Sequence, residues 1–143
     1  MVQDCDDGLK ISGFGHSVQL DEGQTSHRVS QLQGKVEYSA PELLRCEEVT
    51  RATDVWSLGV IMYMLVTGGV SPFYAGSRLR TLFRSLNANC DMKIEQIEKV
   101  SQTGKNLISS LLKKLPSTRL TVEECLHHQW LVNRSRSSRP HLR

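Results

Sequence analysis

The order of apolar and polar positions divides this chain of 143 residues into an irregular N-terminal part and a helical remainder. Residues 2–11 read as two short strands around the turn-forming run Asp4–Gly8, so we expect a β-hairpin there. From Ser12 to Tyr38 neither a strand period nor a helix period persists, and the stretch is rich in Gly, Ser and Gln. Because a plain connection of about 25 residues is uncommon in a compact domain, we expect this loop to be functional or disordered.

A run of apolar residues between Thr53 and Thr67 predicts the central helix of the fold. Thr53 and Asp54 are suited to capping its N-terminus, and Gly68 is suited to ending it. Apolar side chains occupy nearly the whole circumference, which predicts burial on several sides, with Trp56 as a core residue. We therefore expect this helix to be the hub of the core.

Four further helical segments are predicted around it. A short helix begins near Pro41, and an amphipathic surface helix spans Arg78–Leu86 with apolar residues at spacings of three and four. Ser101 is suited to capping the next helix, whose last turn holds two lysines at 113 and 114 before Pro116 stops it. Thr121–Glu124 has the form of a capping box, and we expect the apolar residues of the helix it opens to face the interior: Val122, Cys125, Leu126 and Trp130.

Composition and charge fit an ordinary globular domain and argue against several classes of protein. The chain has 38% apolar and 23% charged residues, and its net charge of +3 comes largely from its last ten residues, so we expect no nucleic-acid partner. The four cysteines lack the C-x-x-C spacing of a zinc site. The longest apolar run, 55–66, is shorter than the roughly 20 residues of a membrane span, and the acidic N-terminus is unlike a signal peptide. We expect a cytoplasmic protein without membrane association.

Four motifs in sequence order then point to a known family. They are Lys10–Gly15, Gly34–Glu42 with its closing Ala-Pro-Glu, Asp54–Gly59, and Pro116–Thr121 followed by His128–Leu131. These resemble, in turn, the K-I-x-D-F-G strand and turn, the A-P-E segment, the D-x-W-S-x-G start of the central helix, and the closing P-x-x-R-x-T and H-x-W-L of protein kinases. Each motif alone is weak, but their order and spacing across Leu9–Leu131 are specific. The chain resembles the C-lobe of a Ser/Thr protein kinase domain.

The resemblance implies a mainly α, incomplete kinase fold with a short β-hairpin, an activation segment and about five helices. It covers residues 1–131 as a partial kinase domain and leaves 132–143 as a basic, Arg/Ser-rich tail. The runs 37–42, 67–73 and 123–130 are similar to the calmodulin-kinase group, in its myosin light chain, titin-obscurin, Trio-kalirin and death-associated branches. Gly15–Leu20 favours Trio and obscurin, whereas the C-terminal run favours the death-associated kinases, so the branch stays open. Association with the cytoskeleton is an option that this group suggests.

The resemblance also assigns roles to individual residues. Glu42 and Arg119 correspond to a buried ion pair that ties the end of the activation segment to the last helices, a structural role. Asp54 corresponds to an acceptor for backbone N–H groups of the catalytic loop, although capping its own helix is an equal alternative. Lys35 and Tyr38 fall in the substrate-docking loop, where Lys35 replaces the usual small hydroxyl residue. Its long cation is expected to disturb the contact with a catalytic aspartate.

The largest departure from the family is Gly13, which replaces the aspartate of D-F-G. That aspartate holds the magnesium that bridges the nucleotide phosphates. Glycine has no side chain, and the neighbouring Ser12 offers only a neutral hydroxyl where magnesium prefers carboxylates. The Gly-rich loop, the strand lysine and the H-R-D loop precede D-F-G in kinases, and this chain begins after them. The resemblance thus implies no catalytic, metal or cofactor residue here; ATP and magnesium are expected only if a complete parent protein is active.

Two functions remain open from the sequence. The first is a truncated kinase-like C-lobe, a pseudokinase that acts as an interaction or scaffold module and binds a protein partner or the missing upstream kinase half. The second is the C-terminal half of an active Ser/Thr kinase that transfers phosphate from ATP in its full-length form. An unrelated helical adaptor would require the four ordered motifs to be a coincidence. In the kinase fold a long helix and the catalytic loop also cover the 53–67 helix, so we expect part of its apolar surface to face water here.

Overall fold

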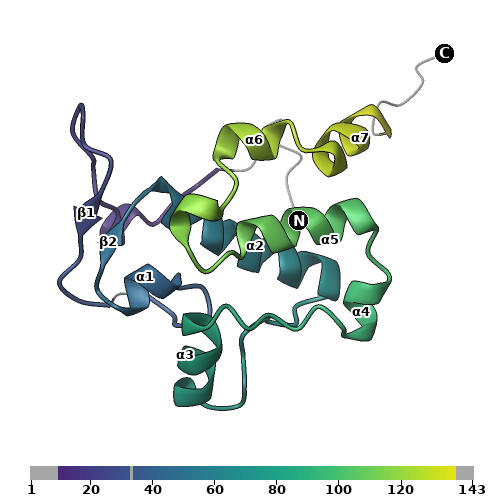
Figure 1. Ribbon diagram of the computed structural model, residues 1–143, viewed down its shortest axis with the longest axis horizontal. Coiled ribbons are helices and arrows are strands. Elements are labelled where there is room, and N and C mark those ends of the chain that lie inside the picture. The colour runs from purple at the N-terminus through teal and green to yellow at the C-terminus, as the bar shows by residue number, and fades with distance from the viewer. Residues whose placement is uncertain (1–9, 33, 138–143) are drawn as a thin grey trace, which may run out of the picture.

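The computed structural model describes residues 10–32 and 34–137, and within these ranges the molecule is mainly α-helical. In Figure 1, α2 and α5 lie side by side in the middle, α6 and α7 lie above them, and β1 and β2 form one edge. The elements in chain order are the 3-10 helix η1 (Phe14–His16), β1 (His27–Arg28), α1 (Pro41–Leu44), β2 (Glu48–Val49), α2 (Arg51–Thr67), α3 (Arg78–Leu86), α4 (Glu95–Glu98), α5 (Gln102–Leu111), the 3-10 helix η2 (Pro116–Thr118), α6 (Val122–Leu126) and α7 (Gln129–Ser137).

The loop between residues 12 and 38 is tied to the rest of the chain by a two-stranded antiparallel pairing. β1 pairs with β2 so that His27 faces Val49 and Arg28 faces Glu48. Ser26 Oγ donates a hydrogen bond to Glu48 Oε2 over 2.9 Å beside this pairing. Strands of two residues are too short to leave a period in the sequence, so the pattern indicated only a loop. The hairpin predicted over residues 2–11 lies almost wholly outside the described residues.

Helix α2 begins earlier than the sequence pattern predicted. Its N-cap is Thr50, whose side chain accepts a hydrogen bond from Ala52 N over 3.1 Å, while Thr53 Oγ1 accepts one from Thr50 N over 3.1 Å. The N-cap therefore lies three residues before the predicted one: Thr53 takes part in the capping box as its N3 residue, whereas Asp54 has no role in it. The predicted end is confirmed, because Gly68 closes the helix in the left-handed conformation at φ 72°.

The buried side of α2 is the hub of the core, as predicted. Trp56, which is fully buried, stacks on Phe73 with ring centroids 5.0 Å apart and planes 8° apart. A Cβ on Gly59 would lie 2.8 Å from Leu111 Cβ, so a glycine is what lets α5 approach α2 this closely. Two clusters of buried residues result, one around Ala40, Trp56, Val60, Tyr63, Phe73, Ile97, Ile108 and Leu112, the other around Val55, Leu107, Leu111 and Cys125.

The other side of α2 is open. Leu58, Ile61 and Leu65 are 42%, 45% and 76% exposed, although they belong to the most apolar helix of the chain. Their spacing of three and four residues puts them on one stripe of the helix. The expectation that part of this helix faces water is confirmed for the described residues.

For the remaining helices, the predicted positions agree with the structure better than the predicted burial of their residues does. The helix at Pro41 and the span of α3 are confirmed, as are the N-cap Ser101 and the capping box of Thr121 and Glu124. α5 ends at Leu111, so the two lysines at 113 and 114 follow the helix instead of forming its last turn. The short α4 was not predicted.

At the C-terminal end the structure has two helices where the sequence predicted one. α6 ends at Leu126 and α7 begins at Gln129. Cys125 is buried and Trp130 is half-buried, as predicted, but Val122 and Leu126 are 50% and 65% exposed. α7 runs on to Ser137, so part of the predicted tail is helical. None of the helices in the described ranges has the length and apolar content that crossing a bilayer requires.

Candidate functional site

A buried ion pair joins two distant parts of the chain at the base of α2. Glu42, in α1, and Arg119, after η2, are 2% and 6% exposed. The pair is bidentate: Nη1 of the arginine is 2.7 Å from Oε1 and Nη2 is 2.8 Å from Oε2. This is the pair that the resemblance implied from residues 77 positions apart, and it fixes the end of the loop segment against the C-terminal helices.

Every donor of the Arg119 guanidinium is used. Besides the carboxylate, Nη1 donates to Ala52 O over 2.8 Å, Nε to Lys113 O over 2.8 Å and Nη2 to Lys114 O over 3.3 Å. The guanidinium carbon also lies 5.1 Å from the centroid of the Trp56 ring. Five N–H groups therefore have five acceptors, which is the condition for a buried charge to be tolerated.

The Glu42 carboxylate is held ionised by the same network. Burial by itself raises the pKa of Glu42, but hydrogen bonds from Arg119 and from the backbone, the arginine charge and the Thr53 hydroxyl together hold it below its ordinary value. Thr53 Oγ1 donates to Glu42 Oε1 over 2.9 Å. Sequence reasoning assigned Thr53 only to a helix cap; its link to Glu42 depends on a tertiary contact that has no local sequence signal.

The segment with Lys35 and Tyr38 forms a tight turn before α1. The carbonyl of Lys35 accepts hydrogen bonds from Tyr38 N over 3.1 Å and from Ser39 Oγ over 3.0 Å. The Ser57 hydroxyl of α2 donates to Tyr38 O over 3.0 Å, which anchors the turn on the central helix. The Lys35 side chain is exposed, whereas Tyr38 is half-buried against the first core cluster. The two residues thus share a turn but face different surroundings.

Gly13 lies at the surface, immediately before η1, with φ 80° and ψ 43° in the left-handed region. Apart from Gly13 and its two chain neighbours, no described residue has an atom within 4 Å of the position that a Cβ would take. The residue therefore offers neither a ligand atom nor a close neighbour that could replace one, and the adjacent Ser12 is exposed. Within residues 10–32 and 34–137, no three His, Cys, Asp or Glu side chains gather as metal ligands would. The described residues do not fit a magnesium–nucleotide site.

Asp54 projects from the first turn of α2 into an open pocket of about 590 Å³. The pocket is also lined by His16 from η1, His27 from β1 and Thr50 from the N-cap. Although the Asp54 side chain is exposed, the pocket walls remove part of its water and so raise the pKa of its carboxyl. Among the described residues, no hydrogen bond or ion pair satisfies this carboxylate. The Glu42 carboxylate, by contrast, is fully paired.

The open stripe of α2 is flanked by two hollows. The larger one, of about 1010 Å³, is lined by Leu58 and Leu65, by Val100 before α5 and by Trp130 of α7. The smaller one, of about 390 Å³, lies on the other side between Ile61, Leu65 and Tyr38. The sequence identified this helix as apolar all round; which side stays open could be learned only from the packed structure.

Comparison with known proteins identifies relatives along nearly the whole chain. Residues 1–131 match the family described as the protein kinase domain. The chain is 36% identical over 127 residues to serine/threonine-protein kinase 17A of Oryctolagus cuniculus, which covers 89% of this chain and 31% of that protein. It is 40% identical over 131 residues to myosin light chain kinase 2, skeletal/cardiac muscle, of Mus musculus, with 87% and 21% covered. The chain therefore spans about one fifth to one third of the length of these relatives.

Solved structures give the same picture of the fold. A structure of the twitchin kinase region from C. elegans matches with a TM-score of 0.64 and 36% identity, over 66% of this chain and 17% of that one. A structure of a twitchin kinase fragment from C. elegans, described as autoregulated protein kinase and immunoglobulin domains, matches with a TM-score of 0.67 and 34% identity, over 75% and 23%.

Proposed function

The chain belongs to the protein kinase domain family, as a C-lobe-like piece with relatives in the calmodulin-kinase group, and on this premise we propose that it is a pseudokinase C-lobe that acts by binding protein. The observation that carries the proposal is the combination of an open apolar side on α2 with a glycine at the metal position. The first supplies a binding surface, and the second removes a group that phosphoryl transfer needs.

The loss of the carboxylate at Gly13 supports the non-catalytic half of the proposal. In this family the acidic residue at that position holds magnesium against the nucleotide phosphates. A hard divalent cation needs oxygen ligands, preferably carboxylates, and Gly13 has none within reach. The exposed ammonium of Lys35 in the docking turn adds a positive charge where the family has a small hydroxyl residue. Neither ATP nor magnesium is therefore part of the proposed function of these 143 residues.

The open side of α2 supports the binding half. Fully burying a Leu or Ile side chain contributes about 1.5–3 kcal/mol, so three partly exposed ones leave a free energy of several kcal/mol for a partner to gain. The two flanking hollows give such a partner concave surfaces on either side of the ridge of Leu58, Ile61 and Leu65. Exposed apolar surfaces of this kind mark sites of protein association.

The partner we propose is the kinase half that precedes D-F-G in the family. In the kinase fold a long helix and the catalytic loop of that half pack on the central helix. The open stripe of α2 offers a place for the helix, and the pocket beside Asp54 offers one for the loop. Hydrogen bonds donated by backbone N–H groups of that loop would also satisfy the Asp54 carboxylate, which lacks a partner among the described residues. The cellular setting we propose is the cytoplasm, with association with the cytoskeleton.

Calorimetric titration of the chain with ATP, with and without magnesium, tests the non-catalytic half. We expect no magnesium-dependent binding, because Gly13 cannot ligate the metal. Magnesium-dependent binding of ATP at micromolar affinity would overturn this half of the proposal.

The binding part of the proposal is tested by measuring hydrogen exchange of the chain with and without the part of a kinase domain that precedes D-F-G. The probe is the part of the kinase domain of Mus musculus myosin light chain kinase 2 that lies before the region matched by this chain. We expect slower exchange around residues 58–65 and a weaker effect in the Leu58→Ser/Leu65→Ser variant. Equal exchange with and without the probe, or equal protection of the variant, would contradict the proposal.

The alternative, an active kinase of which this chain is the C-terminal half, is favoured by one observation. The Glu42–Arg119 pair is fully satisfied, so the scaffold that would hold a substrate-docking loop is intact. A phosphate-transfer assay on the full-length protein separates the two functions. Magnesium-dependent transfer from ATP by the unmodified protein would establish the alternative, whereas transfer that appears only in the Gly13→Asp variant would support a pseudokinase.

A further inference from the structure

Helix α3 packs with its apolar side outward. Its buried residues are Thr81 and Ser85, which are 2% and 0% exposed, whereas Leu79 and Phe83 are 78% and 67% exposed. Positions four apart are neighbours on a helix surface, so Leu79 and Phe83 form one apolar patch. A globular protein normally turns such a patch into its core. The sequence predicted an amphipathic surface helix, but not that Leu79 and Phe83 would face the solvent while Leu82 and Leu86 are half-buried.

Polar contacts hold α3 in this orientation. Thr81 Oγ1 accepts a hydrogen bond from Ala75 N over 3.1 Å, and Arg45 Nη2 donates to Leu86 O at the other end of the helix over 3.1 Å. Arg84 Nη1 donates to Tyr74 O over 3.2 Å. Rotating the helix to bury Leu79 and Phe83 would break the Thr81 contact and expose its side of the helix. The outward patch is therefore a fixed feature of the surface.

The charges on α3 all have one sign. The helix carries three arginines and no acidic residue. Arg78 and Arg80, both exposed, make no side-chain hydrogen bond or ion pair with another residue of the described ranges. They also occupy the first turn, where cations interact unfavourably with the helix dipole. Two arginines at that end do not stabilise α3. An acidic partner would give both of them a favourable interaction.

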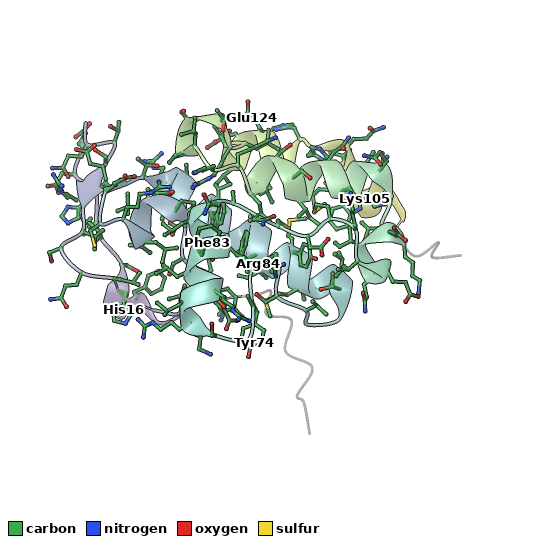
Figure 2. The ribbon with its side chains drawn as sticks, turned by 60° about the horizontal axis from the view of Figure 1, so that its bottom comes forward. His16, Tyr74, Phe83, Arg84, Lys105 and Glu124 are labelled. Atoms are coloured by element: carbon green, nitrogen blue, oxygen red, sulfur yellow. The ribbon has the colours of Figure 1, made fainter. Side chains whose placement is uncertain are left out.

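We propose that the α3 face, defined as Leu79, Phe83, Arg78 and Arg80, docks an acidic amphipathic segment of a partner protein. The apolar pair at spacing four fits side chains three or four residues apart on a partner helix, the usual form of recognition by an apolar helix face. Carboxylates beside those side chains meet the two arginines and the positive end of the helix. Figure 2 shows Phe83 and Arg84 on α3 at the front of the molecule, where a partner can reach the helix.

A protein segment fits this face better than a membrane does. Stable anchoring on anionic lipid takes a large apolar face along an amphipathic helix, and here only two apolar side chains, Leu79 and Phe83, are exposed on a helix of nine residues. The proposal goes beyond the binding of a kinase half, because it concerns a different helix with a basic rim and a partner of defined charge. Loss of one binding activity leaves the other measurable.

Selection of random twelve-residue peptides displayed on phage, with the full 143-residue chain as target, tests this proposal. Two double variants remove one property each: Leu79→Ser/Phe83→Ser removes the apolar pair, and Arg78→Glu/Arg80→Glu reverses the charge. The control variants Leu115→Ser and Lys93→Glu change an exposed apolar residue and an exposed cation elsewhere. Circular dichroism checks that each variant is folded, and chemical-shift changes of the unmodified chain on adding the selected peptide locate the binding site independently.

We expect the unmodified chain and both controls to select peptides with Asp or Glu beside apolar residues three or four apart. The affinity for the best peptide should fall at least tenfold in each α3 variant and should weaken as salt is added. Selection that is unchanged by the α3 variants, or shift changes away from residues 78–83, would overturn the proposal. So would α3-dependent binding to phosphatidylserine vesicles without binding to acidic peptides, or an α3-dependent dimer in sedimentation experiments.

Discussion

The two sides of α2 are both apolar in sequence, but one is buried and the other is largely exposed. On one side Trp56, Val60 and Tyr63 are buried against α5 and neighbouring segments, and every donor of Arg119 at the base of this side has an acceptor. On the other side Leu58, Ile61 and Leu65 meet solvent. Most of the groups that complete the closed side come from residues 97–125 of the same chain, whereas the described residues leave the open side only partly covered.

This contrast separates what the chain stabilises by itself from what it leaves to a partner. The closed side contains the ion pair, the close approach at Gly59 and both core clusters. The open side adjoins the pocket of Asp54, whose carboxylate makes no hydrogen bond or ion pair with another described residue and whose pKa is raised by loss of water. Changes on the closed side should therefore affect the free energy of unfolding, and changes on the open side should affect binding.

The largest effect is expected when Arg119 is replaced by Met. This substitution leaves the Glu42 carboxylate buried without its partner, which costs about 3–5 kcal/mol of folding free energy. Urea unfolding followed by circular dichroism measures the loss. The control is Lys99→Met, which breaks the exposed pair with Glu95 at 2.7 Å and should cost less than about 1 kcal/mol. Equal losses in the two variants would mean that the closed side does not depend on its buried pair.

Acidification should also weaken the Glu42–Arg119 pair, but it should lower the folding stability by less than Arg119→Met does. The folded-state pKa of Glu42 lies below its unfolded value, so the pair stabilises the fold at neutral pH and loses that effect as the pH falls through the folded pKa. The window lies below about pH 5, since an unfolded glutamate titrates near 4.3. Urea midpoints measured across this window should fall steeply for the unmodified chain and less steeply for Glu42→Gln. Parallel curves would contradict this assignment.

Replacing Gly59 by Ala should disturb the contact between α2 and α5. The added methyl would lie 2.8 Å from Leu111 Cβ and 2.9 Å from Leu112 Cδ2, and overpacking of this kind costs about 1–3 kcal/mol. Gly15→Ala is the matched control, because no atom lies within 4 Å of its Cβ position. Thermal unfolding should show a lower midpoint for the first variant and an unchanged one for the second.

On the open side, Leu58→Ser/Leu65→Ser should leave the unfolding free energy within about 0.5 kcal/mol, as is usual for exposed positions. The same variant should bind less of a dye that reports exposed apolar surface. The matched change on the closed side is Leu107→Ser, a fully buried position that should destabilise strongly. A large destabilisation by the open-side variant would show that these leucines are already covered within the chain.

A small effect on stability, with the opposite sign, is expected from Asp54→Asn. Because partial burial raises the pKa of this carboxyl, its charged form disfavours folding above that pKa, and the amide removes the cost. We expect a gain below about 1 kcal/mol at pH 7, since the side chain is exposed. The gain should disappear once the pH is low enough to protonate Asp54. A loss of stability would instead reveal a partner for Asp54 within the chain.

Much of the architecture could be predicted from the sequence because its signals are local. Pro41, the end of α2 at Gly68, the N-cap Ser101 and the capping box at Thr121 each act within one helical turn, so their elements were found. The start of α2 was misplaced because Thr50 and Thr53 are both competent caps, and only the backbone geometry selects Thr50. Two-residue strands and the four-residue α4 are too short for any period to be recognised.

The sequence by itself determined the family, the order of the helices that it predicted and the identity of the two residues that form the buried pair. The motifs carry this information because each fixes a backbone feature or a charge at a set spacing. The tertiary structure alone decided which side of α2 stays open and that α3 turns Leu79 and Phe83 outward. Whether a residue is buried depends on what packs against it. The hydrophobicity of its side chain gives only the free energy that burial would contribute. An apolar helix therefore looks the same in sequence whether its partner lies in the same chain or in another.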